Sequence, residues 1–120
     1  MAALTIDTIF DAAARILLRE EKSIGLVFSR NGVCIRFPTT RRLAEFLSVP
    51  HYYVLPFFAM MEQEALVTRA ERVGIHTTAK GSAKLLGLIV DQYRSEGEAL
   101  LGTVILGEVT RRACAYLQVS

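Results

Sequence analysis

The residue types that most often carry catalysis or bind metals are sparse in this chain. His51 and His76 have no cysteine or carboxylate partner at a spacing typical of a metal site or a catalytic triad. Cys34 and Cys114 also lack metal-ligand spacing. We expect both to be reduced and to be buried as small apolar side chains. The glycines are isolated and form no phosphate-binding loop. The sequence therefore predicts no enzyme, no cofactor and no metal site.

Basic side chains offer a different chemistry, which is contact with phosphate. The 120-residue chain has 14 Lys and Arg against 12 Asp and Glu, so its net charge is only +2. The segment from Arg30 to Lys84 holds eight basic and four acidic residues, whereas the remainder holds six basic and eight acidic ones. This balance excludes a general nucleic-acid coat protein but places the positive charge on one half of the chain. Taken singly, each cation is more typical of an ordinary solvated surface, whereas the cluster as a whole slightly favours contact with nucleic acid.

Composition indicates one domain and a tendency to self-associate. The hydrophobic share of 52% slightly exceeds the usual range, and terminal helices that meet a partner chain would explain the excess. No basic-then-apolar signal sequence opens the chain, and charged residues interrupt the longest apolar stretch near the C-terminus. We therefore expect a cytoplasmic protein with no membrane partner.

The first elements that could position these residues are a helix and a hairpin. Residues 5–21 place apolar side chains every three or four positions, which predicts an amphipathic helix. Asn31-Gly32 between two β-rich runs predicts a hairpin with a type I′ turn, although residues 24–28 are also compatible with a loose segment. Alternate residues of the second strand should face the core, namely Val33, Ile35 and Phe37.

The centre of the chain, 39–81, predicts two short helices, a second hairpin and the start of another helix. Thr39 or Thr40 caps the first helix, and the turn at 48–50 separates it from the second. Pro56 is unfavourable inside a helix, so either the second helix kinks or its regular part begins near Leu55. Strands at 66–69 and 73–77 then flank a short tip at 70–72, and Thr77 or Thr78 caps the following helix.

The C-terminal part predicts two further helices separated by a polar break. One helix runs from Gly81 to Arg94, the break lies at 95–97, and the last helix extends from about Glu98 to Leu117. The apolar surface of the last helix is wider than one stripe, so we expect it to form a homodimer together with the N-terminal helix. The expected dimer contacts are Ile6, Phe10, Leu101, Ile105, Val109 and Tyr116.

This order of elements resembles the winged helix-turn-helix of small transcriptional regulators of the MarR, PadR, ArsR and Rrf2 kinds. The resemblance rests on the two helices and their turn, on Ala65-Leu66-Val67 before the wing, and on Thr78-Ala79-Lys80-Gly81 after it. It implies an α+β, mainly α, fold with a small antiparallel sheet and additional C-terminal helices. The winged-helix domain would span 1–95, with the helix-turn-helix at about 39–65 and the wing at 66–77, and 96–120 would be the dimerisation element. The three-cysteine cluster of Rrf2-type regulators is absent, so no cofactor follows.

The resemblance implies a transcriptional regulator that binds double-stranded DNA as a homodimer. Its second helix would face the major groove with Pro50, Leu55, Pro56 and Ala59 among its residues, and these positions lack the Arg, Asn and Gln that read bases. Contact would therefore be mostly with the DNA backbone. The expected nucleic-acid-binding residues are Thr39, Thr40, Arg41, Arg42, His51, Tyr52, Tyr53, Arg69, Arg72, His76, Lys80 and Lys84.

The aromatic tip around Tyr52 and Tyr53 favours an alternative from another function class. Apolar and aromatic patches are typical of protein interfaces, so the same fold would serve as a protein-protein interaction module without DNA binding. Tyr52, Tyr53 and Phe57 could instead pack against the N-terminal hairpin. A third possibility is a ligand sensor with an apolar pocket between the terminal helices, although the sequence names no ligand.

Overall fold

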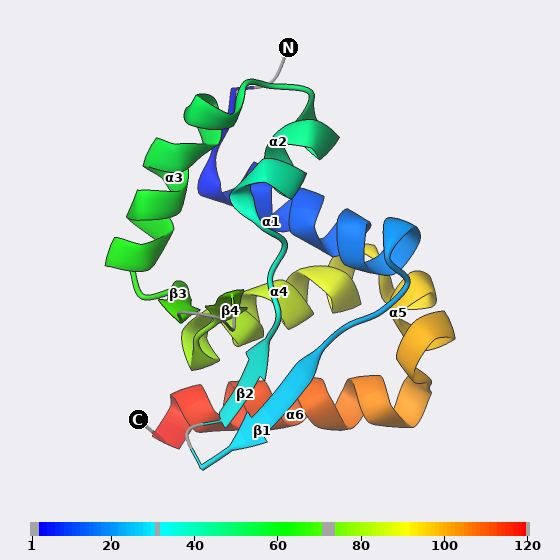
Figure 1. Ribbon diagram of the computed structural model, residues 1–120. Helices are drawn as coiled ribbons and strands as arrows, with labels where there is room; N and C mark the ends of the chain where they lie inside the picture. The colour runs from blue at the N-terminus through cyan, green and yellow to red at the C-terminus, as the bar shows by residue number, and fades with distance from the viewer. Residues whose placement is uncertain (1–2, 31, 71–73, 120) are drawn as a thin grey trace.

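The computed structural model describes residues 3–30, 32–70 and 74–119, with side chains described up to residue 115. The fold is mainly helical, with two separate two-stranded antiparallel sheets (Figure 1). The predicted α+β, mainly α, class is thereby confirmed. Every helix in the described part of the chain is too short or too polar to cross a membrane.

The N-terminal helix α1 (Ile6–Arg15) begins with a reciprocal cap between Thr5 and Thr8. The Thr5 hydroxyl accepts a hydrogen bond from the Thr8 amide at 3.0 Å, and the Thr8 hydroxyl accepts one from the Thr5 amide at 2.8 Å. The α-helical pattern ends earlier than the predicted range 5–21, because Ile16–Glu20 forms a π-helical segment, η1. This segment continues the buried face of α1 with Ile16, Leu17 and Leu18.

The strands β1 (Leu26–Ser29) and β2 (Gly32–Ile35) form the predicted first hairpin. Gly32 is a strand residue paired with Ser29 and has a φ of 107°, whereas Asn31, the other residue of the predicted turn, lies outside the described residues. The predicted alternation is confirmed, since the core-facing residues are buried and Cys34 and Arg36 are more exposed. Beyond β2, the Phe37 amide donates to the Ile75 carbonyl at 2.9 Å, which joins this segment to the second hairpin.

The helices α2 (Thr40–Leu47) and α3 (His51–Gln63) are joined by a three-residue turn at 48–50. Thr39 is the cap of α2, because its hydroxyl accepts a hydrogen bond from the Arg42 amide at 3.1 Å. The helix α3 is regular from His51 onward and contains Pro56, so the alternative in which it begins near Leu55 is wrong.

The second hairpin consists of β3 (Val67–Ala70) and β4 (Gly74–Thr77), within a residue of the predicted strands. Most of the predicted tip falls on 71–73, which the structure does not describe. Thr78 caps the following helix α4 (Ala79–Gln92) by accepting a hydrogen bond from the Gly81 amide at 3.1 Å. A Cβ added at Gly81 would lie 1.9 Å from the Leu66 carbonyl oxygen, so the hairpin and α4 approach as closely as only glycine allows.

A fully buried polar network ties both hairpins to α4. The Ile35 amide of β2 donates to the Thr77 hydroxyl at 2.8 Å, and this hydroxyl lies 2.6 Å from that of Ser82. The Ser82 hydroxyl also donates to the Val33 carbonyl. Because these groups are buried, their pairing avoids the cost of an unsatisfied polar atom.

The C-terminal part forms α5 (Arg94–Leu101) and α6 (Thr103–Val119), where the sequence predicted one last helix from about Glu98 to Leu117. The predicted break at 95–97 is misplaced, because α4 already ends at Gln92, Tyr93 separates it from α5, and Gly97 lies inside α5, buried against Ile89 and Leu106. A second break divides α5 from α6 at Gly102, whose φ of 88° favours glycine.

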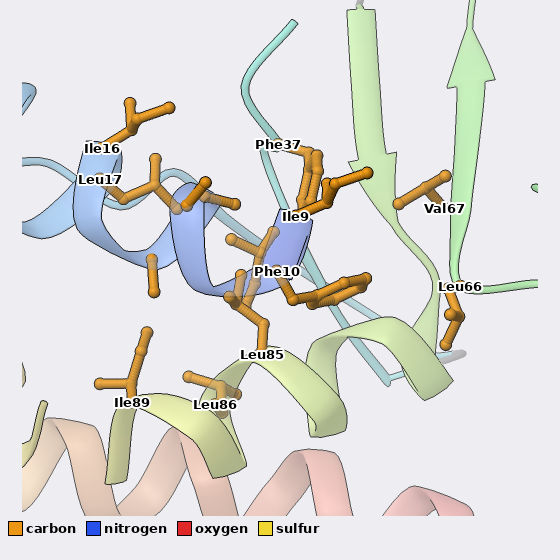
Figure 2. Close-up of a cluster of buried hydrophobic side chains, with 14 of the residues drawn as sticks. Ile9, Phe10, Ile16, Leu17, Phe37, Leu66, Val67, Leu85, Leu86 and Ile89 are labelled. Carbon is orange, nitrogen blue, oxygen red and sulfur yellow. The ribbon is translucent and has the colours of Figure 1, made fainter. Parts of the chain in front are cut away.

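The core is centred on α1 and α4, with β2 beside them and α6 on the far side of α4 (Figures 1 and 2). Figure 2 shows Phe10 of α1 facing Leu85 of α4, close to Phe37, and the centroids of the two phenylalanine rings lie 5.3 Å apart. At the other end of α1, the Tyr93 hydroxyl accepts from the Arg15 guanidinium at 2.9 Å and donates to Asp11 at 2.5 Å. The core thus leaves the outer face of α3 and one face of α6 at the surface.

Candidate nucleic-acid interface

The outward face of α3 carries large apolar side chains. Val54, Phe58 and Met61 point into the core, while four other residues of the helix are between 41 and 64% exposed. We name these four the α3 surface, and they are Tyr52, Tyr53, Leu55 and Met60. The two tyrosine rings meet edge to face with centroids 4.8 Å apart. Both tyrosines are exposed, so their proposed packing against the first hairpin is wrong.

The start of α3 is fixed to the start of α2 by one side-chain contact. The His51 Nε2 atom lies 2.8 Å from the Thr40 hydroxyl, and both residues are partly buried. This contact gathers the predicted residues of the two helices at one end of α3. It also occupies one ring nitrogen of His51 and the hydroxyl of Thr40, so these two atoms are less available to a ligand.

The four predicted residues at the start of α2 differ in whether their side chains are already engaged within the chain. Thr39 uses its hydroxyl for the helix cap, and Arg42 forms an ion pair with Glu20 of η1. Arg41 is exposed and makes no ion pair or side-chain hydrogen bond with the described residues. It is therefore the residue of this group that is most available to a phosphate.

A hollow of about 410 Å3 opens beside the start of α2. Its polar lining includes Arg36, Thr39 and Arg42, together with Glu21. Arg36 is exposed, and it was not among the predicted site residues. The signal that could have found it was the strand alternation, which places Arg36 opposite the buried Ile35 and Phe37.

The predicted cations after α3 are largely engaged within the chain. The Arg69 guanidinium lies 3.8 Å from the Glu62 carboxylate and 4.9 Å from the centre of the Phe58 ring. Its side chain therefore packs on the C-terminal half of α3. Lys80 donates to the Glu64 carbonyl at 3.1 Å. The predicted Arg72 lies outside the described residues, and His76 is half-buried in β4.

Lys84 is not part of the same surface. Its ammonium group lies 2.7 Å from the Asp7 carboxylate and 5.5 Å from the centre of the Phe10 ring, which places it between α4 and α1. The predicted nucleic-acid residues therefore fall into a group at the N-terminal ends of α2 and α3, a group around the second hairpin, and this separate lysine.

Some of the predicted dimer contacts are buried in the core of their own chain. Phe10 and Val109 are only 1 and 4% exposed because they pack in the core of their own chain, so both assignments are wrong. Ile6 and Leu101 are half-buried and Ile105 is exposed, while the Tyr116 side chain is not described. Two exposed apolar residues that the prediction omitted are Phe28 and Val104.

The cysteines and the groups that could bind a metal ion lie outside the α3 surface. Cys114 is exposed and Cys34 is partly buried, so the prediction of two buried cysteines is wrong. Among the described residues, no three His, Cys, Asp or Glu side chains gather as a metal ion would require. The chain matches no protein-family model and no curated protein. What the exposed ends of α2 and α3 offer is aromatic faces, phenolic hydroxyls and a guanidinium group.

Proposed function

We propose that this chain is a winged-helix DNA-binding protein that acts as a transcriptional regulator and binds duplex DNA as a homodimer, mostly through backbone contacts. The order α2, turn, α3, β3 and β4 supports this assignment, as does the short pairing of Phe37 with Ile75 beside the second hairpin. The observation that carries the proposal is the exposed N-terminal half of α3, whose start contacts the start of α2. The neighbouring Arg41 makes no ion pair with any residue that the structure describes.

The side chains at this end of the molecule suit positioning on DNA better than reading its sequence. The hydroxyls of Tyr52 and Tyr53 can bond phosphates or base edges, and Arg41 can bond a phosphate beside the amides at the start of α2. Arg, Asn and Gln, which make the usual bidentate contacts to guanine and adenine, do not occur from His51 to Met61. We therefore expect weak dependence on base sequence.

The ion pairs around this surface are compatible with phosphate contact. The pairs Arg42–Glu20 and Arg69–Glu62 both lie at the surface, where such pairs stabilise the fold by only about 0–1 kcal/mol. A DNA phosphate could therefore replace either carboxylate as the partner of the guanidinium group. Because Glu20 and Glu62 compete with DNA phosphates for these guanidinium groups, the affinity for DNA should be modest. Because the contacts are to phosphates, the affinity should also fall strongly as salt rises.

The test is fluorescence anisotropy of a labelled random-sequence duplex titrated with the full chain across a salt series. We expect Arg41→Ala to weaken binding and to reduce the slope of log affinity against log salt by about 1. The matched control is Arg94→Ala on α5, which lies on the opposite side of the molecule from α3 (Figure 1) and should leave binding unchanged. Absence of binding at the lowest salt would contradict the proposal.

A second candidate, a protein-interaction module, is favoured by the apolar part of the α3 surface. Leu55 and Met60 are exposed and offer no hydrogen bond to DNA, whereas both could fill pockets on a partner protein. A pull-down with the wild type and a Tyr52→Ala, Tyr53→Ala double variant separates the two candidates. If the double variant keeps every protein partner but loses DNA, the interaction module is excluded.

A further inference from the structure

The first hairpin and α6 together form a second exposed apolar surface, which we name the hairpin–α6 surface. Phe28 of β1 and Val104 and Ile105 of α6 are between 49 and 77% exposed. They line a hollow of about 470 Å3 whose rim includes Glu108, Arg111 and Arg112. The Arg112 guanidinium lies 5.3 Å from the centre of the Phe28 ring and so helps to hold β1 against α6.

The strand β1 gives this surface a second feature suited to association. Within the described residues, β1 pairs with β2 alone and so forms an edge of its sheet. An edge strand beside an apolar hollow can serve as a template for another chain. On the pleated strand, Phe28 points to the same side as the buried Val33 opposite it, which directs its ring toward α6.

The charges on the rim indicate which chain would fit. Glu108 and Arg111 are both well exposed, and they form an ion pair of 2.7 Å along α6. If a second α6 lies antiparallel across the first, Glu108 of each chain can face Arg111 of the other around a two-fold axis. Such a face is self-complementary, which is the requirement for a closed symmetric dimer. The third charged residue of the rim, Arg112, contacts the Phe28 ring.

We propose that the hairpin–α6 surface is where a second copy of this chain binds. This inference rests on the homodimer that is part of the proposed function and specifies its interface, although it does not require DNA contact. The apolar residues Phe28, Val104 and Ile105 would be buried at its centre, with the exchanged Glu108 and Arg111 at the rim. The interface differs from the sequence prediction because it uses the first hairpin in place of α1.

The first test measures the mass of the full chain by sedimentation equilibrium in the absence of DNA. We expect a dimer for the wild type and a monomer, or at least about a ten-fold rise in the dimer dissociation constant, for Ile105→Glu. The matched control is Leu55→Glu on the α3 surface, which introduces the same charge at a similarly exposed apolar residue and should remain dimeric. Circular dichroism verifies that each variant is folded.

A second test uses the rim charges and does not depend on the apolar centre. Glu108→Arg should weaken the dimer by placing like charges opposite each other, and the added change Arg111→Glu should restore it. A wild-type monomer, or an Ile105→Glu variant that stays as dimeric as the wild type, would overturn this interface. Because mass is measured without DNA, either result leaves the DNA-binding proposal to be judged by its own titration. Capture of a small apolar molecule in the hollow by a wild-type monomer would likewise exclude a second copy as the occupant.

Discussion

The α3 surface and the hairpin–α6 surface are both apolar, but they are built and bordered differently. The first comes from one helix and includes the phenolic hydroxyls of Tyr52 and Tyr53, and the start of this helix contacts the start of α2, which carries Arg41. The second joins Phe28 of β1 to residues of α6 far along the chain, and it is bordered by opposite charges that pair with each other. A surface with hydrogen-bond donors and a cation suits a polyanion, whereas a surface with one acid and one base that can pair across a two-fold axis suits its own copy.

The two surfaces share one support, which is the junction of the hairpins with α4, and disrupting it should have the largest effect. We expect Gly81→Ala to lower the free energy of unfolding by about 1–3 kcal/mol or more, because its Cβ would overlap the Leu66 carbonyl oxygen. Chemical denaturation measures the change.

Gly87→Ala is the matched control in the same helix, because a Cβ there meets no atom within 4 Å. It should be neutral or stabilise the protein by up to about 1 kcal/mol through helix propensity. Equal destabilisation by the two substitutions would contradict the close approach of the Leu66 carbonyl to α4.

The buried network at Thr77 tests whether the two hairpins depend on one another. Thr77→Val removes the acceptor of the Ile35 amide and should cost about 1–3 kcal/mol, because that amide stays buried without its partner. Hydrogen exchange should then accelerate in both β2 and β4. Thr68→Val on exposed β3 is the control and should change stability by less than about 0.5 kcal/mol. Faster exchange in β4 alone would show that the two hairpins are supported independently.

The smallest expected effect lies away from both surfaces, at the Arg19–Glu96 ion pair between η1 and α5. The Arg19 guanidinium donates two hydrogen bonds to Glu96 and lowers the pKa of that carboxyl below its ordinary value. A lowered folded-state pKa stabilises the protein above the unfolded-state pKa, and this contribution is lost as pH falls through the folded value. Glu96→Gln should therefore reduce the melting temperature slightly at neutral pH and match the wild type in acid.

Thermal melts of Glu96→Gln and Glu98→Gln across acid to neutral pH provide the comparison. Glu98 forms no ion pair with the described residues, so its substitution should show no such convergence. Neither variant should alter DNA affinity or the dimer mass. A deficit for Glu96→Gln that persists at acid pH would exclude the ion pair as its cause.

The elements that the sequence predicted well are those fixed by neighbouring residues. The cap at Thr39, the turn at 48–50 and the alternation from Val33 to Phe37 each follow from local chemistry, and the structure has all of them. Most of the α3 surface was also predictable, because Tyr52, Tyr53 and Leu55 lie close together in the sequence.

The features that the sequence could not predict depend on contacts between distant segments. Ser95-Glu96-Gly97 resembles a break, yet packing of Gly97 against Ile89 and Leu106 keeps it helical. An apolar helix face does not show which neighbour covers it, so Phe10 and Val109 were assigned to a dimer although they fill the core. Likewise, the ion pairs that engage Arg42 and Lys84 join separate elements.

The central claim, that the two surfaces have separate binding partners, is tested most directly by measuring DNA affinity and mass on the same two variants. The account predicts that Tyr52→Ala, Tyr53→Ala weakens binding to random-sequence duplex and leaves the dimer mass unchanged. It predicts that Ile105→Glu becomes monomeric. This variant should lose only the part of the DNA affinity that comes from linking two DNA-binding surfaces in one dimer. The claim would be contradicted if the tyrosine variant lost the dimer, or if Ile105→Glu remained dimeric while losing DNA.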